Sequence, residues 1–203
     1  MTTKAVLEKK QTRKRNGEPV PISTETYYEE YRDREDNFKY ELVDGRIEKY
    51  EKTMNDNHLY ISFNLHHFFS SLLAAGKVQG TFQAEKDTEL WKNHVRIPDM
   101  CYLSMRQVLE AYEGKHPVAE FVIEVVSPTD KALKYSEKIE DYFKAGVKVV
   151  WMIYPNTKQV LVHVHNSSNV TSCKGETICS AAPVLPEFAL TANEVFKKPT
   201  LNK

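Results

Sequence analysis

The chain has 203 residues, which is enough for one domain with a sizeable hydrophobic core. Its 28 lysine and arginine residues equal its 28 aspartate and glutamate residues, so net charge alone predicts no polyanionic partner, although a single groove could still be basic. The three cysteines, Cys101, Cys173 and Cys179, lack the spacing of a zinc site, and no apolar stretch approaches about 18 residues. With no signal peptide visible, these features favour a reduced, cytoplasmic protein.

Residues 1–20 are polar and basic and contain almost no apolar anchors. We interpret them as a disordered basic arm, followed by a single domain over residues 21–203. The arm could be a nucleic-acid-binding or localisation tail, or simply a solvated terminus. Ser23 or Thr24 then offers an N-cap for a short helix that contains three tyrosines.

A β-hairpin is predicted next, with residues 38–43 and 46–50 as its strands and Asp44-Gly45 as its turn. Between residues 58 and 75 the apolar side chains recur at helical spacing, and a glycine closes this helix. The hairpin and the helix together predict an N-terminal α/β unit before the main run of strands.

Short strands and helices alternate through the rest of the chain. We expect strands around 78–90 and 95–103, a helix at 104–112, a strand around Glu124, a helix at 129–145, and strands at 147–153 and 160–165. Counted from the helix at 58–75, and without the short helix at 104–112, the order is helix, three strands, helix, strand. It predicts a mixed α/β fold in which the strand–helix–strand segment over 121–153 forms a parallel crossover.

The most informative stretch is 121–128, an apolar run rich in β-branched residues that Glu124 interrupts. Such a run is typical of a strand buried on both faces, where an unpaired charge costs on the order of several kcal/mol. Asp99 interrupts a second apolar segment, at 96–103, in the same way. Two carboxylates on two buried strands are a donor set suited to a hard divalent cation.

Each candidate residue also has a non-catalytic interpretation. Asp99 could be a turn or strand-end residue, and Glu124 could form a structural ion pair with Lys138. Lys138 flanks the apolar face of its helix, so its long side chain could bend toward the carboxylates, or it could be an ordinary solvated lysine. Glu41, in the first hairpin strand, could approach the site or occupy a solvated position.

An ordered set of short motifs runs through the chain. They are Tyr40-Glu41-Leu42-Val43-Asp44-Gly45, Pro98-Asp99, Val122-Ile123-Glu124-Val125-Val126-Ser127-Pro128, Lys138 with Tyr142, Ala145-Gly146-Val147, Val150-Trp151-Met152-Ile153 and Leu185-Pro186-Glu187-Phe188. Over roughly residues 24–196 this set resembles the Uma-type restriction endonuclease family, within the PD-(D/E)xK nuclease superfamily. The resemblance implies a restriction-endonuclease-like fold, an αβββαβ core with an N-terminal helix and β-hairpin, and magnesium-dependent hydrolysis of phosphodiester bonds. It also implies nucleic acid, DNA above all, as partner and a homodimer, which the aromatic-rich segment 27–40 also favours.

The resemblance also gives the candidate residues their roles. Asp99 and Glu124, helped by the Val125 carbonyl, would bind Mg²⁺ or Mn²⁺. Lys138 would act in catalysis from the helix, because Val126 stands where many related nucleases carry their lysine. Three positions depart from the family pattern without removing the proposed metal carboxylates: Arg46, Lys134 and Tyr154. The alternative function is a catalytically silent, nuclease-like module that binds nucleic acid or a protein.

Overall fold

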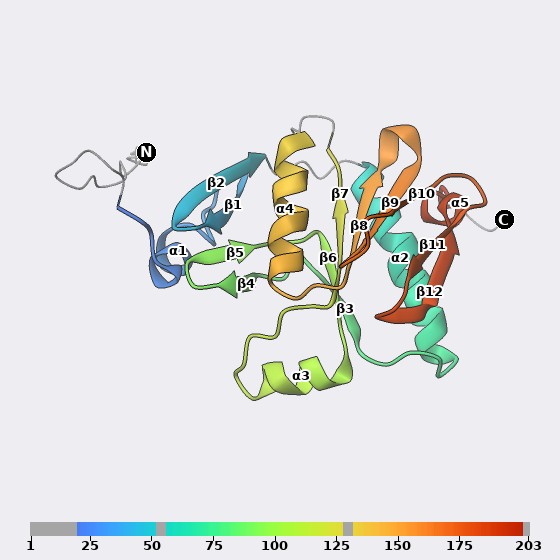
Figure 1. The fold of residues 1–203 in the computed structure, drawn as a ribbon, viewed down its shortest axis with the longest axis horizontal. Helices are drawn as coiled ribbons and strands as arrows, with labels where there is room; N and C mark the ends of the chain where they lie inside the picture. The colour runs from blue at the N-terminus through green and yellow to red at the C-terminus, as the bar shows by residue number, and fades with distance from the viewer. Residues whose placement is uncertain (1–19, 52–55, 128–131, 201–203) are drawn as a thin grey trace, which may run out of the picture.

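The computed structural model describes residues 20–51, 56–127 and 132–200 (Figure 1). The basic arm expected over residues 1–20 therefore lies almost wholly outside the described residues. The first elements are α1 (Thr24–Glu30), the hairpin strands β1 (Phe38–Val43) and β2 (Arg46–Glu51), and the long helix α2 (Asp56–Ala74). Ser23 caps α1 by accepting a hydrogen bond from the Thr26 N–H, and the hairpin turns at Asp44-Gly45, both as predicted.

The next four strands are divided between two sheets. They are β3 (Thr81–Ala84), β4 (Thr88–Trp91), β5 (His94–Arg96) and β6 (Met100–Leu103). Strands β4 and β5 join the hairpin in a four-stranded sheet of order β2-β1-β5-β4, whereas β3 and β6 belong to a six-stranded sheet.

The single strands expected at 78–90 and 95–103 are therefore wrong, because each of these segments contains two strands. Pro98 has no N–H to donate to a ladder, and it lies in the connection that carries the chain from β5 to β6. Asp99 lies in this connection, directly before β6, and not within a strand.

The second half of the chain follows the predicted alternation. Its elements are α3 (Met105–Tyr112), β7 (Phe121–Val125), α4 (Ala132–Lys144), β8 (Val149–Tyr154), the 3₁₀ turn η1 (Pro155–Thr157) and β9 (Gln159–Val164). Strands β7 and β8, which precede and follow α4 in the sequence, run parallel as predicted. Strand β9 is antiparallel to β8.

Four further elements near the C-terminus were not predicted from the sequence. They are β10 (Val170–Cys173), β11 (Ile178–Ala181), β12 (Leu185–Thr191) and α5 (Ala192–Val195). The complete order of the six-stranded sheet is β10-β9-β8-β7-β6-β3, and β11 pairs with β12 in a separate two-stranded sheet.

The six-stranded sheet is covered on both faces (Figure 1). Phe121 and Ile123 point to a core formed with α2, β12 and α5, whereas Val122 belongs to a second core that includes Tyr142 of α4. Because side chains alternate along a strand, Glu124 falls on the same face as Val122. The alternation of β7 therefore aims Glu124 at α4.

A third, smaller core lies between α1 and the four-stranded sheet. Tyr27, Tyr40, Leu42 and Val95 are buried in it, and the Tyr27 hydroxyl donates a hydrogen bond to the Tyr40 carbonyl at 2.9 Å. Part of the aromatic segment that favoured a homodimer is thus internal, whereas Tyr28 remains exposed. Its side chains give this small sheet a core of its own.

Candidate active site

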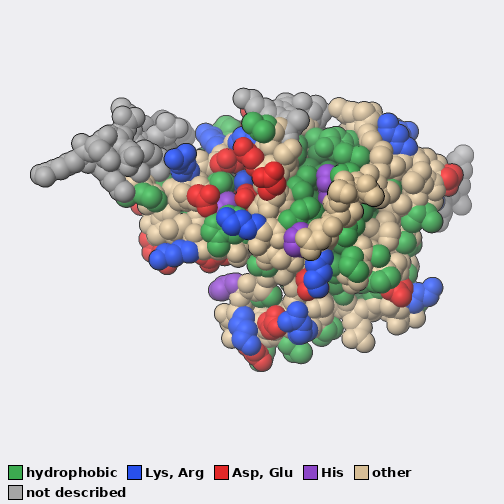
Figure 2. Space-filling view, in the orientation of Figure 1, with side chains coloured by type: hydrophobic (Ala, Val, Ile, Leu, Met, Phe, Trp, Pro, Cys, Tyr) green, Lys and Arg blue, Asp and Glu red, His purple; other side chains and the backbone are tan. Residues whose placement is uncertain are grey.

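The candidate residues come from four separate segments. Glu41 lies on β1, Glu124 on β7 and Lys138 on α4, and Asp99 lies in the connection between β5 and β6. Figure 1 shows α4 between the four-stranded sheet and β7, so these segments meet beside one helix. Acidic and basic side chains also gather on the surface over this part of the molecule (Figure 2).

Lys138 is a buried cation held between two carboxylates. Its Nζ donates hydrogen bonds to Glu41 Oε1 at 2.9 Å and to Glu124 Oε1 at 3.2 Å. The whole residue is only 4% exposed, so the ordinary solvated position is excluded. Burial lowers the pKa of the Lys138 ammonium, but Glu124 and Glu41 raise it more, and the net shift is upward.

Glu124 has a second donor on the same helix. The Tyr142 hydroxyl donates to Glu124 Oε1 at 2.6 Å. Tyr142 follows Lys138 by one helical turn, so α4 presents both donors on one face. Burial raises the pKa of Glu124, and although Lys138 acts in the opposite direction, the net shift is upward.

Glu41 lies at the centre of the buried charges. Besides the Lys138 contact, its Oε2 accepts from Arg96 Nη1 at 3.0 Å and its Oε1 from the Ile97 N–H at 3.1 Å. Burial raises the pKa of the Glu41 carboxyl, but Lys138, Arg96 and Lys39 lower it more, to about 2. Glu41 is therefore an ionised part of the site, and the solvated hairpin position is wrong.

Arg96 was missed in the sequence and joins α4 to the four-stranded sheet. Its Nε and Nη2 both donate to Asp141 Oδ2, at 2.9 and 2.6 Å, and its Nη1 also reaches Glu48 Oε2 at 3.2 Å. His94 Nε2 lies 3.0 Å from the same Asp141 oxygen. Arg96 stands between Val95 and Ile97 at the start of the apolar segment 96–103, and this short pattern is the only local signal that could have identified it.

Asp99 lies at the more open side of the site. Its Oδ2 accepts a hydrogen bond from the Val125 N–H at 2.7 Å, which brings the end of β7 to the carboxylate. Its Oδ1 lies 3.4 Å from the Nζ of Lys39, a residue that was also missed in the sequence. The Asp99 and Lys39 side chains are each 18% exposed.

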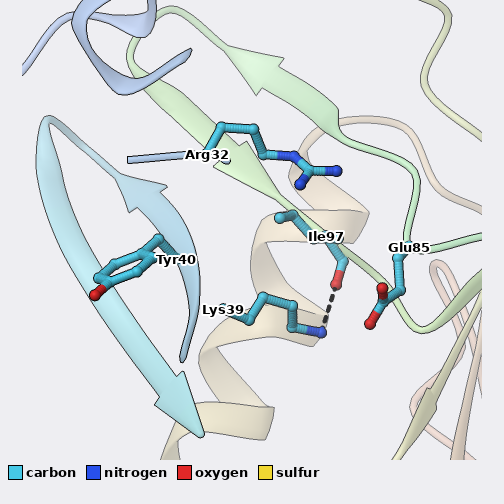
Figure 3. A pocket seen from close by; sticks show the side chains of 5 residues that line it. All are labelled: Arg32, Lys39, Tyr40, Glu85 and Ile97. Atoms are coloured by element: carbon cyan, nitrogen blue, oxygen red, sulfur yellow. Dashed lines mark hydrogen bonds between the residues drawn. The ribbon is translucent and has the colours of Figure 1, made fainter. Parts of the chain in front are cut away.

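The site therefore has two parts, which we name by their accessibility. Glu41, Arg96, Glu124 and Lys138 form the closed end, and Lys39 and Asp99 form the open end. A pocket of about 40 Å³ adjoins the open end (Figure 3). Its lining residues are Arg32, Lys39, Tyr40, Glu85 and Ile97. This volume holds a few water molecules.

The donors suit a partly hydrated hard cation. No group of three or more His, Cys, Asp or Glu side chains in the described ranges could hold a metal. Mg²⁺, however, is usually bound through one or two carboxylates and keeps several waters, in contrast to a cage built of protein ligands alone. Asp99 and Glu124 fit that requirement, because both are carboxylates and the Asp99–Val125 hydrogen bond brings Asp99 to the residue that follows Glu124.

Comparisons with known proteins agree with this picture. A model of the Uma2 family, described as "Putative restriction endonuclease", matches residues 25–193. Among solved structures, a "putative nuclease belonging to DUF820" from Anabaena variabilis is 16% identical, covers 87% of this chain and 98% of its own, and has a TM-score of 0.72. At this identity the likeness shows a shared fold, and the predicted fold class is confirmed.

No curated protein matches the chain. Within the described residues, every helix is too short or too polar to span a membrane.

Proposed function

The chain belongs to the Uma2 family of restriction endonucleases, and from this premise we propose that it hydrolyses phosphodiester bonds of nucleic acid with the help of Mg²⁺ or Mn²⁺. The observation that carries the proposal is the position of Lys138, whose ammonium lies between Glu41 and Glu124. Burying so many charges is a poor way to stabilise a fold, because the desolvation of each ion opposes the attraction between them. Clusters of this kind concentrate at functional sites.

Each residue has a distinct part in the proposed reaction. Asp99 and Glu124, with the Val125 carbonyl, would hold the cation, which supplies an acidified water and neutralises charge on the phosphate. The Tyr142 hydroxyl fixes the orientation of Glu124. Lys138 would donate a hydrogen bond to the phosphate oxygen on which negative charge grows during the attack. Glu41 would be a positioning residue that keeps the Lys138 ammonium in place.

One observation favours the alternative of a catalytically silent module. The cations of the closed end already have carboxylate partners, Lys138 with Glu41 and Glu124, and Arg96 with Asp141. A purely structural ion network would look similar. The two functions differ in what Glu124 must do, because a silent module needs no ionised carboxylate there to bind nucleic acid.

A cleavage assay separates the two functions. The wild-type protein would be incubated with Mn²⁺ and a panel of duplex DNA, single-stranded DNA and RNA, beside Glu124→Gln and the control Glu120→Gln. Glu120 precedes β7 and pairs with Lys148 on the surface, so its substitution removes a carboxylate outside the site. We expect wild type and Glu120→Gln to cleave and Glu124→Gln to be inactive. Equal cleavage by Glu124→Gln, or binding of the panel without cleavage by wild type, would favour the silent module.

Three further properties are proposed, two from the family resemblance and the location from the cysteine usage. We propose DNA as the substrate, the cytoplasm as the location and a homodimer as the assembly. The three cysteines are free and buried, as expected of a protein in a reducing compartment. Light scattering at tens of micromolar checks the assembly, and a monomeric mass would argue against the dimer.

A further inference from the structure

Lys39 is a second lysine at the site, and it contacts Asp99 from β1, whereas Lys138 contacts Glu124 from α4. Its Nζ lies 3.4 Å from Asp99 Oδ1 and donates to the Ile97 carbonyl at 3.3 Å. Figure 3 shows this ammonium directed at the Ile97 carbonyl, within the pocket of the open end. The site thus holds two lysines, and each contacts one of the proposed metal carboxylates.

The β1 strand explains why Lys39 faces the site. Side chains alternate along a strand, so Lys39 and Glu41 lie on one face and Tyr40 and Leu42 on the other. Tyr40 and Leu42 fill the small core, which leaves the Lys39–Glu41 face to the site. The strand therefore supplies an anion to the closed end and a cation to the open end.

The two lysines differ in the number of their carboxylate partners and in the distances to them. Lys138 has two carboxylate partners, and its Nζ also lies 5.0 Å from the centre of the Tyr50 ring. Lys39 has one carboxylate partner, at a distance longer than the roughly 2.7–2.9 Å of a good charge-assisted hydrogen bond. A lysine ammonium turns on a flexible four-carbon stem, so the Lys39 contact can be exchanged for another anion.

We propose that Lys39 neutralises Asp99 in the cation-free protein and moves to a non-bridging phosphate oxygen of the substrate once a divalent cation has taken Asp99. The inference rests on the proposed function and adds a second substrate-binding lysine to it. A metal ion and an ammonium cannot both lie on Asp99 Oδ1 without strong repulsion. The displaced ammonium still borders the pocket, which Glu85 also lines, and a phosphate group bound there would offer the ammonium a non-bridging oxygen.

The test uses Lys39→Met, which keeps the length of the side chain and removes its charge. Calorimetric titration of Mn²⁺ without nucleic acid should show binding about tenfold tighter than in wild type, because a competing cation has gone. Binding of a short DNA duplex, with Ca²⁺ in place of Mg²⁺, should weaken. The slope of log affinity against log salt should fall by about one, as expected for the loss of one phosphate contact.

Two companion variants control for charge and folding. Lys148→Met removes a lysine that pairs with Glu120 on the surface, and it should match wild type in both titrations. Lys39→Arg keeps the charge and should restore wild-type Mn²⁺ affinity and the salt slope. If Lys39→Met is poorly folded, Lys39→Gln removes the same charge with a polar side chain, and its Mn²⁺ binding should tighten in the same way.

The outcomes distinguish the inference from the proposed function. Unchanged or weaker Mn²⁺ binding by folded Lys39→Met, in a wild type that binds Mn²⁺ and cleaves, overturns the inference alone. An unchanged salt slope likewise overturns the transfer of Lys39 to phosphate. If wild type neither binds Mn²⁺ nor cleaves, the proposed function fails and the inference fails with it.

Discussion

The closed and open ends of the site use the same kinds of charged groups in different ways. At the closed end, Glu41, Arg96, Glu124 and Lys138 are between 0% and 4% exposed, and each has at least two polar partners. At the open end, Lys39 and Asp99 share one ion pair of 3.4 Å, their other partners are the backbone groups of Ile97 and Val125, and both side chains are 18% exposed. The fold therefore fixes the positions of Lys138 and Glu124 between charged partners and leaves the longer Lys39–Asp99 contact free to exchange.

The largest expected effect is the loss of stability on removing the central charge of the closed end. Glu41→Gln would leave Arg96 and Lys138 buried with one carboxylate fewer, which should lower the free energy of unfolding by about 3–5 kcal/mol. Glu120→Gln, at an exposed ion pair, should lower it by less than about 1 kcal/mol. Urea denaturation measures both. An equal loss of unfolding free energy in the two variants would mean that the ion pairs of the closed end stabilise the fold no more than a surface ion pair does.

The same residue gives the closed end a dependence on pH. The Glu41 pKa falls from 4.5 to about 2 in the folded protein, so its contribution to stability is complete above about pH 4.5. That contribution should be lost as the pH falls toward 2. Over this range the Glu41 carboxyl becomes protonated in the unfolded chain while it is still ionised in the folded protein. The difference in melting temperature between wild type and Glu41→Gln should narrow over this range. A constant difference would contradict the lowered pKa.

Next in size is the effect of Lys138 on turnover. Lys138→Ala should reduce the cleavage rate by a factor on the order of 10²–10³, the scale for losing one preorganised donor at a transition state. Mn²⁺ affinity should persist or rise, since a repelling cation has been removed. Lys134→Ala is the matched control, because Lys134 lies one turn earlier on α4 and is partly exposed. If Lys138→Ala cleaves as fast as wild type, the catalytic role of this lysine is wrong.

A smaller effect tests the hydrogen bond that orients Glu124. Tyr142→Phe removes a donor to a charged group and should lower the free energy of unfolding by about 1.5–3 kcal/mol. Tyr102→Phe makes the same chemical change at a hydroxyl that donates to the neutral Gln79 carbonyl, and should cost about 1 kcal/mol. A Tyr142→Phe loss no larger than the Tyr102→Phe loss would show that Glu124 does not need this donor.

The elements that could be predicted from the sequence are those with a strong local signal. Three local signals each predicted an element and the place of one site residue. The Asp44-Gly45 turn placed Glu41 on a hairpin strand, the helical spacing of α4 placed Lys138, and the apolar run of β7 placed Glu124. The division at Pro98 was also present as a local signal, because a proline cannot continue a ladder. The apolar residues on both sides of Pro98 nevertheless led to the prediction of a single strand over 95–103.

What could not be predicted depends on contacts between distant segments. Lys39 looks like any exposed hairpin lysine until β1 is placed beside the β5–β6 connection that carries Asp99. Asp141 looks like a solvated helix residue until Arg96 is brought to it from the other sheet. No periodicity within one segment records such pairings, because they depend on how two sheets and a helix pack together.

Calorimetric titration with Mn²⁺ tests the central claim most directly, since it asks whether Asp99 and Glu124 hold a cation. Wild type and the surface control Glu120→Gln should bind Mn²⁺, and neither Asp99→Asn nor Glu124→Gln should bind it, because both keep the shape of the side chain and remove its charge. Circular dichroism would show that the variants are folded. Unchanged Mn²⁺ affinity in both site variants would contradict the metal-dependent nuclease proposed here.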